Sequence, residues 1–258
     1  MNSIKVTLAG AVTTVRLARP QVLNAIDPGM HEELEAAFNA FAADPDQHIC
    51  VITGEGRGFC AGSDLKQVAT DGIHREYPEH GYAGLIERFD CPKPFIAAVN
   101  GVALGGGFEL ALACDIVIAA ESASFGLPEP LVGAVALGGG VHRLARQIGL
   151  KRAMGMILAS RRVDATEGER LGFVTEVVPD AVLEATVARW CEAILKGAPL
   201  SLRASKEAVM RGLDEPSLAA AMQNQTEYPA FAAWRSSDDA REGPRAFAEK
   251  RPPVWKSR

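Results

Sequence analysis

The chain has 258 residues, of which 48% are hydrophobic and 23% charged, and its formal net charge is −5. This composition is typical of a folded globular protein and argues against wholesale disorder. Proteins that hold nucleic acid are usually basic, so the negative charge counts against that class of function. No stretch approaches the roughly 18 consecutive apolar residues of a membrane span, and the first residues lack the apolar core of a signal peptide.

Cysteine and histidine are scattered along the chain, five of each. The cysteines form no CxxC pair, and an odd, unpatterned set is typical of reduced thiols in a cytoplasmic protein. The histidines show no metal-ligand spacing with one another or with cysteine. We therefore expect a cytoplasmic protein without a metal site.

Short apolar runs alternate with glycine turns and helical patterns along most of the chain. The segments VTLAG and TTVRLAR predict a strand pair that turns at Gly10-Ala11, and a helix follows from about Pro28 with Asp27 as its N-cap. The runs HICVITGEG, FIAAVNG and CDIVIAAESASFG predict further short strands. Recurring strand–loop–helix units indicate an α/β fold with several parallel strand pairs.

Two other regions differ from this pattern. Residues 66–80 are polar and aperiodic, which predicts a loop. From about residue 180 the chain is alanine-rich and amphipathic, which predicts helices without strands. We expect a core domain over 1–197 and a helical section over 198–258.

Glycine-rich turns precede two predicted helices. In GRGFCAGSDLK (56–66) the last glycine is followed by Asp64, which can begin a helix, and Gly105-Gly106-Gly107 precede a helix near Phe108. Glycine permits sharp turns, and a helix start exposes free N–H groups that favour a negative oxygen. Each turn alone is explained as well by a tight structural connection. Together, one N–H from each turn could form an oxyanion hole.

Glu109 and Glu129 are the candidate acid–base groups. Glu109 lies in the first turn of a helix that is apolar on nearly all sides, where a carboxylate needs a partner or a function. A structural ion pair or a favourable helix dipole explains it equally well. Glu129 lies between two prolines after a short strand, and a solvated turn residue is its alternative. Two carboxylates that face each other can hold a water, one as base and one as acid.

These segments together resemble the crotonase (enoyl-CoA hydratase/isomerase) superfamily. The similar stretches are RPQVLNAID, FCAGSDLK, AAVNGVALGGGFELALACD, FGLPEPLVG, GGGVHRLARQIG and EGPRAFAEKRPPVW, in this order. Each is modest, but their order and spacing are specific. Within the superfamily, GGGFELALA and the tail resemble the carnitinyl-CoA dehydratase branch most.

The resemblance implies a spiral of ββα turns followed by helices that assemble trimers, often as a dimer of trimers. It implies an acyl-CoA thioester substrate and no metal or redox cofactor, since coenzyme A is part of the substrate. The oxyanion donors would be the backbone N–H groups of Ser63 and Gly106, and Glu109 and Glu129 would be the catalytic pair. Other residues would contact coenzyme A: Val22, Asn24, Ala25, Ala61, Ser63, Asp64, Leu65, Lys66, Phe247 and Lys250.

Two departures from the family pattern and several alternatives remain. Val135-Ala136-Leu137-Gly138 stands where hydratases usually carry a proline turn, and Ser63 stands where alanine is common.

An enoyl-CoA isomerase or decarboxylase needs only one carboxylate, so the presence of both glutamates favours a hydratase. A CoA-binding paralogue without catalytic activity is a third possibility. A serine hydrolase through Ser63 is disfavoured because GxSxG is absent.

Overall fold

The computed structural model describes residues 3–71 and 76–257, and their strands form two sheets. The larger sheet has six strands in the order β1-β2-β3-β5-β7-β10, and the smaller has four in the order β4-β6-β8-β9. The larger sheet contains β1 (Ile4–Ala9), β2 (Val12–Leu17), β3 (Ile49–Gly54), β5 (Phe95–Val99), β7 (Ile116–Ala120) and β10 (Glu176–Val178). The smaller sheet contains β4 (Gly58–Cys60), β6 (Val102–Leu104), β8 (Ser124–Gly126) and β9 (Val163–Asp164).

From β3 to β8, consecutive strands alternate between the two sheets, which produces the ββα spiral. β3, β5 and β7 join the larger sheet, and the strand after each of them, β4, β6 or β8, joins the smaller one. Pairing is parallel except for the β1–β2 hairpin and the β8–β9 pair. Every residue of β3 and β5 is buried, as expected for central parallel strands. The predicted α/β crotonase fold is confirmed.

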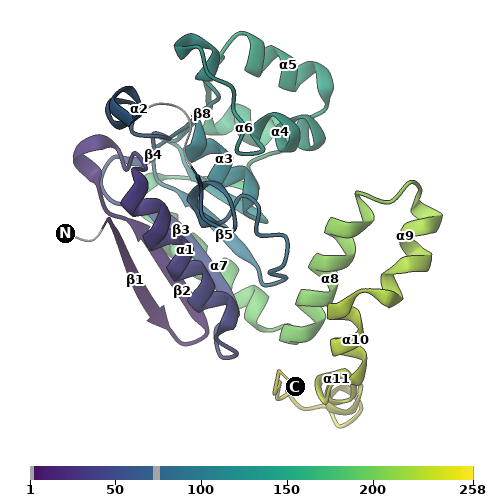
Figure 1. Ribbon diagram of the computed structural model, residues 1–258. Coiled ribbons are helices and arrows are strands. Elements are labelled where there is room, and N and C mark those ends of the chain that lie inside the picture. Colours follow the sequence, from purple (N-terminus) through teal and green to yellow (C-terminus); the bar gives the residue numbers. More distant parts are fainter. Residues whose placement is uncertain (1–2, 72–75, 258) are drawn as a thin grey trace. The chain divides into compact units, whose positions relative to one another are not determined.

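Helix α1 (Pro28–Ala43) covers the larger sheet (Figure 1). Asp27 caps it as predicted, because its carboxylate accepts a hydrogen bond of 2.9 Å from the Met30 N–H. On its inner face, Phe38 and Phe41 pack edge-on against Phe95 of β5, with ring centroids 5.7 and 5.3 Å apart. This packing fixes α1 beside the loops that leave the central strands.

The remaining helices follow in chain order: α2 (Leu65–Asp71), α3 (Gly106–Ala113), α4 (Gly140–Ile148), α5 (Leu150–Leu158), α6 (Ala165–Leu171), α7 (Leu183–Leu195), α8 (Pro199–Gly212), α9 (Leu218–Asn224), α10 (Pro229–Ser236) and α11 (Asp239–Ala248). α2 corrects the loop predicted for 66–80. A parallel bridge between Ile26 and Ser63 sets the direction of the chain just before α2. This tertiary pairing outweighs the polar, aperiodic local sequence that predicted a loop. Residues 72–75 of that prediction lie outside the described residues.

The chain divides into two compact units, described separately here. The first comprises Met1–Arg88 and Phe95–Arg189, and the second comprises Phe89–Pro94 and Trp190–Arg258. The second unit is helical apart from its connections, and the boundary expected at residue 197 falls inside it. No described helix combines the length and apolar character needed to cross a bilayer.

Candidate active site

The two glycine-rich turns lie against each other. β4 and β6 pair in parallel, so the loops that follow them leave the smaller sheet side by side. A Cβ atom at Gly62 would lie 2.8 Å from the carbonyl oxygen of Leu104 and 3.0 Å from the nitrogen of Gly106. Gly62 also has a φ of +88°, a conformation that side-chain-bearing residues rarely adopt. Glycine at this position permits the close approach of the two loops.

Ser63 and Gly106 carry the two N–H groups at this junction. Gly106 is the first residue of α3, where a backbone N–H has no partner within the helix. At Ser63, the bridge to Ile26 uses the Gly62 carbonyl, at 2.8 Å, and the Asp64 N–H, at 3.0 Å. Within the described residues, neither Ser63 nor Gly106 has a hydrogen bond recorded at its N–H. The pair is therefore available to an external oxygen.

Glu109 is buried on the first turn of α3, with 3% of its surface exposed. Its Oε1 accepts a 2.8 Å hydrogen bond from the Gly140 N–H at the start of α4. Cβ atoms at Gly138 and Gly140 would lie 2.7 and 2.8 Å from its carboxylate oxygens. These two glycines make room for the carboxylate.

Glu129 approaches the same junction from the 3-10 helix Glu129–Val132, which follows β8. Its Oε1 lies 3.1 Å from the position of a Cβ atom at Gly105. Its Oε2 is buried without a hydrogen-bond partner in the described structure. Burial raises the pKa of Glu129 above its ordinary value, because a buried carboxylate is less well solvated. An unpartnered carboxylate oxygen beside the oxyanion turn can bind water or a substrate atom.

The pKa of Glu109 is set by burial and by its neighbours. Burial raises the pKa of Glu109 from 4.5 to about 7, opposed by the Gly140 N–H and reinforced by the charge of Glu129. A carboxyl group with a pKa near 7 can both take up and give up a proton at neutral pH, which suits acid–base catalysis.

The comparisons with known proteins agree with this geometry. Residues 7–258 match the family model described as enoyl-CoA hydratase/isomerase. A carnitinyl-CoA dehydratase from Proteus mirabilis is 40% identical over 100% of this chain and 99% of its own length. The chain belongs to the enoyl-CoA hydratase/isomerase family. It is a crotonase-family enzyme.

Solved structures of the family are similar over the full chain. An enoyl-CoA hydratase from Mycobacterium marinum superposes with a TM-score of 0.92 at 33% identity and covers 100% of both chains. Another, from Geobacillus kaustophilus, has a TM-score of 0.89 at 39% identity and covers 99% of this chain and 98% of its own.

The predicted CoA-contacting residues of the first unit form one framework. Ala61 donates its N–H to the Leu23 carbonyl at 3.0 Å, which joins the 22–25 segment to the 61–66 loop. Asn24 is fully buried, and its side chain bonds only to backbone groups of Arg19, Glu55 and Gly58. Val22 and Ala61 are partly exposed, Ala25 is buried, and Leu65 and Lys66 are exposed. The exposed residues are accessible to a ligand, whereas Asn24 shapes the turn.

An arginine clamp holds the same framework together. Arg19 reaches the carboxylates of Asp27 at 3.1 Å and Asp64 at 3.2 Å and donates to the Ala25 carbonyl at 2.5 Å. Asp64 is thus already engaged in an ion pair.

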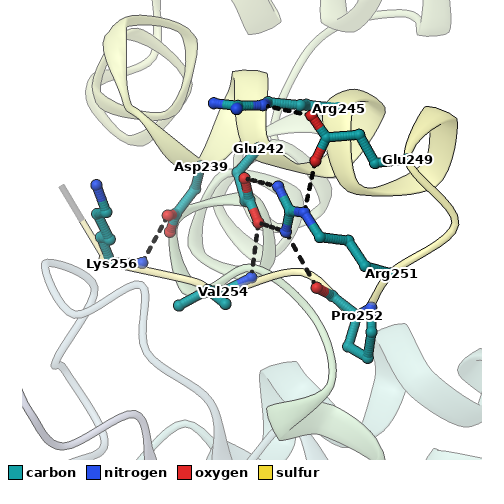
Figure 2. Close-up of polar contacts among 8 residues, drawn as sticks. All are labelled: Asp239, Glu242, Arg245, Glu249, Arg251, Pro252, Val254 and Lys256. Carbon is teal, nitrogen blue, oxygen red and sulfur yellow. Dashed lines mark hydrogen bonds and ion pairs between the residues drawn. The ribbon is translucent and has the colours of Figure 1, made fainter.

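Phe247 and Lys250 belong to the second unit. Phe247 is exposed, and Lys250 occupies a turn with a φ of +52°. Figure 2 shows how the tail around this turn is held: Arg251 binds Glu242 and Glu249 through its guanidinium group. Arg251 lowers the pKa of Glu242 to about 2, so this ion pair persists across the physiological range. The contacts of Phe247 and Lys250 with coenzyme A stay predictions.

One group among the described residues has donors suited to a cation. Ligand atoms of Glu35, Glu79 and His80 lie within 4.8 Å of one another. The Glu35 carboxylate, however, already contacts His80 at 2.6 Å and Arg88 at 3.5 Å. The adjacent arginine disfavours a second positive charge, so this cluster is explained as a partly buried network of polar contacts.

The pKa of Glu109 predicts a pH effect on stability. The folded protein keeps this proton up to about pH 7, whereas the unfolded chain loses it near pH 4.5. The carboxyl therefore lowers the free energy of unfolding as pH rises between these values, by about 3 kcal/mol at most. The difference in free energy of unfolding between Glu109→Gln and wild type should therefore be more favourable to the variant at pH 8 than at pH 5. Urea unfolding of both proteins at the two pH values measures this, and Glu121→Gln, at an exposed position, is the control. Parallel pH dependences would contradict the assignment.

Proposed function

We propose that the protein catalyses the reversible addition of water to the double bond of a 2-enoyl-CoA thioester. One observation carries this proposal: the buried Glu109 and the half-buried Glu129, both with raised pKa values, lie beside the two turns that carry the N–H groups of Ser63 and Gly106. Two carboxyl groups are what addition of water requires, because one proton must be removed from water and another delivered to carbon.

The proposed mechanism begins at the thioester carbonyl. Its oxygen accepts hydrogen bonds from the N–H groups of Ser63 and Gly106, which stabilise the enolate formed during the reaction. Glu109 and Glu129 hold a water over the β-carbon. As the water oxygen bonds to the β-carbon, one carboxylate takes a proton from the water and the α-carbon receives a proton from the pair. Dehydration is the reverse, with both bonds broken and water released.

The acyl group is the open part of this proposal. The relative from Proteus mirabilis is named a carnitinyl-CoA dehydratase and matches the full chain, which favours a β-hydroxyacyl-CoA of that type as the second candidate substrate. An isomerase or decarboxylase on the same scaffold, and a CoA-binding paralogue without activity, remain further alternatives.

A substrate panel distinguishes these candidates. Purified protein is mixed with crotonyl-CoA, a long-chain 2-enoyl-CoA and crotonobetainyl-CoA, and the absorbance of the conjugated thioester is followed. We expect hydration of at least one, with the highest kcat/KM identifying the acyl preference. Binding of all three without loss of absorbance would contradict the proposal and favour the paralogue without activity.

Assembly and location belong to the same proposal. The family resemblance favours a homotrimer or a dimer of trimers, and the odd, unpatterned set of cysteines favours the cytoplasm. Light scattering of the purified protein gives the mass of the assembly directly, and a monomer would contradict this part.

A further inference from the structure

Tyr82 lies beside the two N–H groups, although the family pattern assigned it no role. It begins the 3-10 helix Tyr82–Gly84, and 5% of its surface is exposed. Its hydroxyl lies 3.3 Å from the Ser63 hydroxyl. A Cβ atom at Gly106 would lie only 2.4 Å from the same phenolic oxygen. The Tyr82 hydroxyl therefore touches both residues whose backbone N–H groups would bind the thioester oxygen.

The hydroxyl groups of Tyr82 and Ser63 together carry one more proton than their mutual hydrogen bond uses. Tyr82 and Ser63 each carry one O–H, and their mutual hydrogen bond uses only one of the two protons. At 3.3 Å this bond is longer than the usual 2.5–3.0 Å between hydroxyls. No acceptor for the second proton is recorded in the described part of the chain. One hydroxyl proton is thus available at the site where negative charge would develop.

The surroundings hold Tyr82 in place. Its ring packs edge-on against His31 of α1, with centroids 4.6 Å apart, and the next residue, Ala83, donates its N–H to His31 Nδ1 at 2.9 Å. Ala83 has a φ of +57°, a strained conformation for alanine. Such strain persists only where the surrounding structure enforces it, and it is concentrated at functional sites. The hydroxyl is therefore preorganised.

The ionisation of Tyr82 is also suitable for a donor. Burial raises its pKa well above the ordinary value, and the nearby Glu109 carboxylate raises it further. The phenol thus keeps its proton throughout the pH range in which the enzyme works.

We propose that the Tyr82 hydroxyl is a third hydrogen-bond donor to the thioester oxygen, and hence a catalytic residue. The inference rests on the proposed hydratase function, since it needs an acyl-CoA whose carbonyl occupies the N–H pair. Ser63 then acts through Tyr82: its hydroxyl orients the phenol, while its backbone N–H binds the same oxygen.

The test replaces Tyr82 by phenylalanine, which keeps the ring and removes only the hydroxyl. We expect kcat for the preferred enoyl-CoA to fall about 10²-fold, as for other lost oxyanion donors, with KM nearly unchanged. Tyr77→Phe is the matched control, because its ring lies 5.6 Å from that of Tyr82 in the same aromatic cluster and is half exposed. Thermal unfolding of each variant verifies that the fold is retained.

A spectroscopic measurement separates a donor from a merely structural residue. A cinnamoyl-CoA with a para-amino group absorbs at longer wavelength when its carbonyl oxygen is polarised by hydrogen bonds. We expect a red shift on binding to wild type and to Tyr77→Phe, and a smaller shift with Tyr82→Phe. An undiminished shift with Tyr82→Phe would overturn the inference, whatever its kcat.

The same measurement distinguishes the inference from the proposed function. A wild-type protein that hydrates no enoyl-CoA, but shows the Tyr82-dependent shift, would refute the hydratase while supporting Tyr82 as a donor. Failure of the wild type to bind the thioester at all would refute both.

Discussion

Replacing either glutamate by glutamine is expected to reduce kcat for hydration by about 10²–10⁴-fold, the usual contribution of general acid–base catalysis. Glutamine matches glutamate in size but cannot take up or give up a proton. Glu109→Gln keeps an oxygen for the Gly140 N–H, so the hydrogen bond of 2.8 Å can survive. Turnover of a saturating enoyl-CoA measures the effect, with Glu121→Gln as the control.

Both variants are needed to distinguish a hydratase from an isomerase. In a hydratase the two losses should be similar, because the glutamates act on one water. If Glu129→Gln retained near wild-type turnover while Glu109→Gln did not, a single-carboxylate reaction would be the better description. Binding of the substrate by both variants shows that the losses arise in the chemical step.

A methyl group at Gly62 is expected to separate the two oxyanion turns. Gly62→Ala would place Cβ 2.8 Å from a backbone oxygen and 3.0 Å from the Gly106 nitrogen, and neither backbone atom can move aside without shifting its loop. A displacement of about 1 Å can cost 10²-fold in rate. We expect kcat to fall by at least that factor and the protein to lose stability as well.

Gly172→Ala provides the control for backbone strain. Gly172 has a φ of +102°, and a Cβ atom there would meet nothing within 4 Å. This variant should lose about 1–2 kcal/mol of stability from the left-handed backbone but keep its kcat. Equal kcat values for Gly62→Ala and Gly172→Ala would show that the contact between the turns is unimportant for catalysis.

The site was partly predictable because its framework is encoded locally. Glycines before a helix start, and a glutamate in an apolar helix, are signals that short-range chemistry explains. The contact between the two turns needs the parallel pairing of β4 with β6, which no local pattern specifies. From the residues alone the convergence of the two turns was one possibility, and the order of the motifs along the chain, through the family resemblance, favoured it.

Tyr82 and the extent of helix α2 beyond its start were missed for a related reason. Both lie in or next to a polar, aperiodic segment, where local sequence patterns carry little information. α2 begins where long-range pairing fixes the chain, and Tyr82 is positioned by His31 from α1. Gly81 and Gly84 lie on either side of this segment and have positive φ values. In the sequence, these two glycines are the feature that could have predicted a tight turn at Tyr82.

The departure at Val135-Ala136-Leu137-Gly138 lies next to Glu109. A Cβ atom at Gly138 would lie 2.7 Å from a Glu109 carboxylate oxygen. Ala136 is buried, whereas Val135 and Leu137 are exposed. The family's proline is absent from this turn, but Gly138, which makes room for the Glu109 carboxylate, is present.

Isotope labelling tests the central claim most directly. The protein is incubated with its preferred 2-enoyl-CoA in water labelled with oxygen-18, and the product is analysed by mass spectrometry. Our account predicts a 3-hydroxyacyl-CoA with one labelled oxygen on the β-carbon, formed about 10²–10⁴-fold more slowly by Glu109→Gln or Glu129→Gln. A product with a shifted double bond and no labelled oxygen would contradict it.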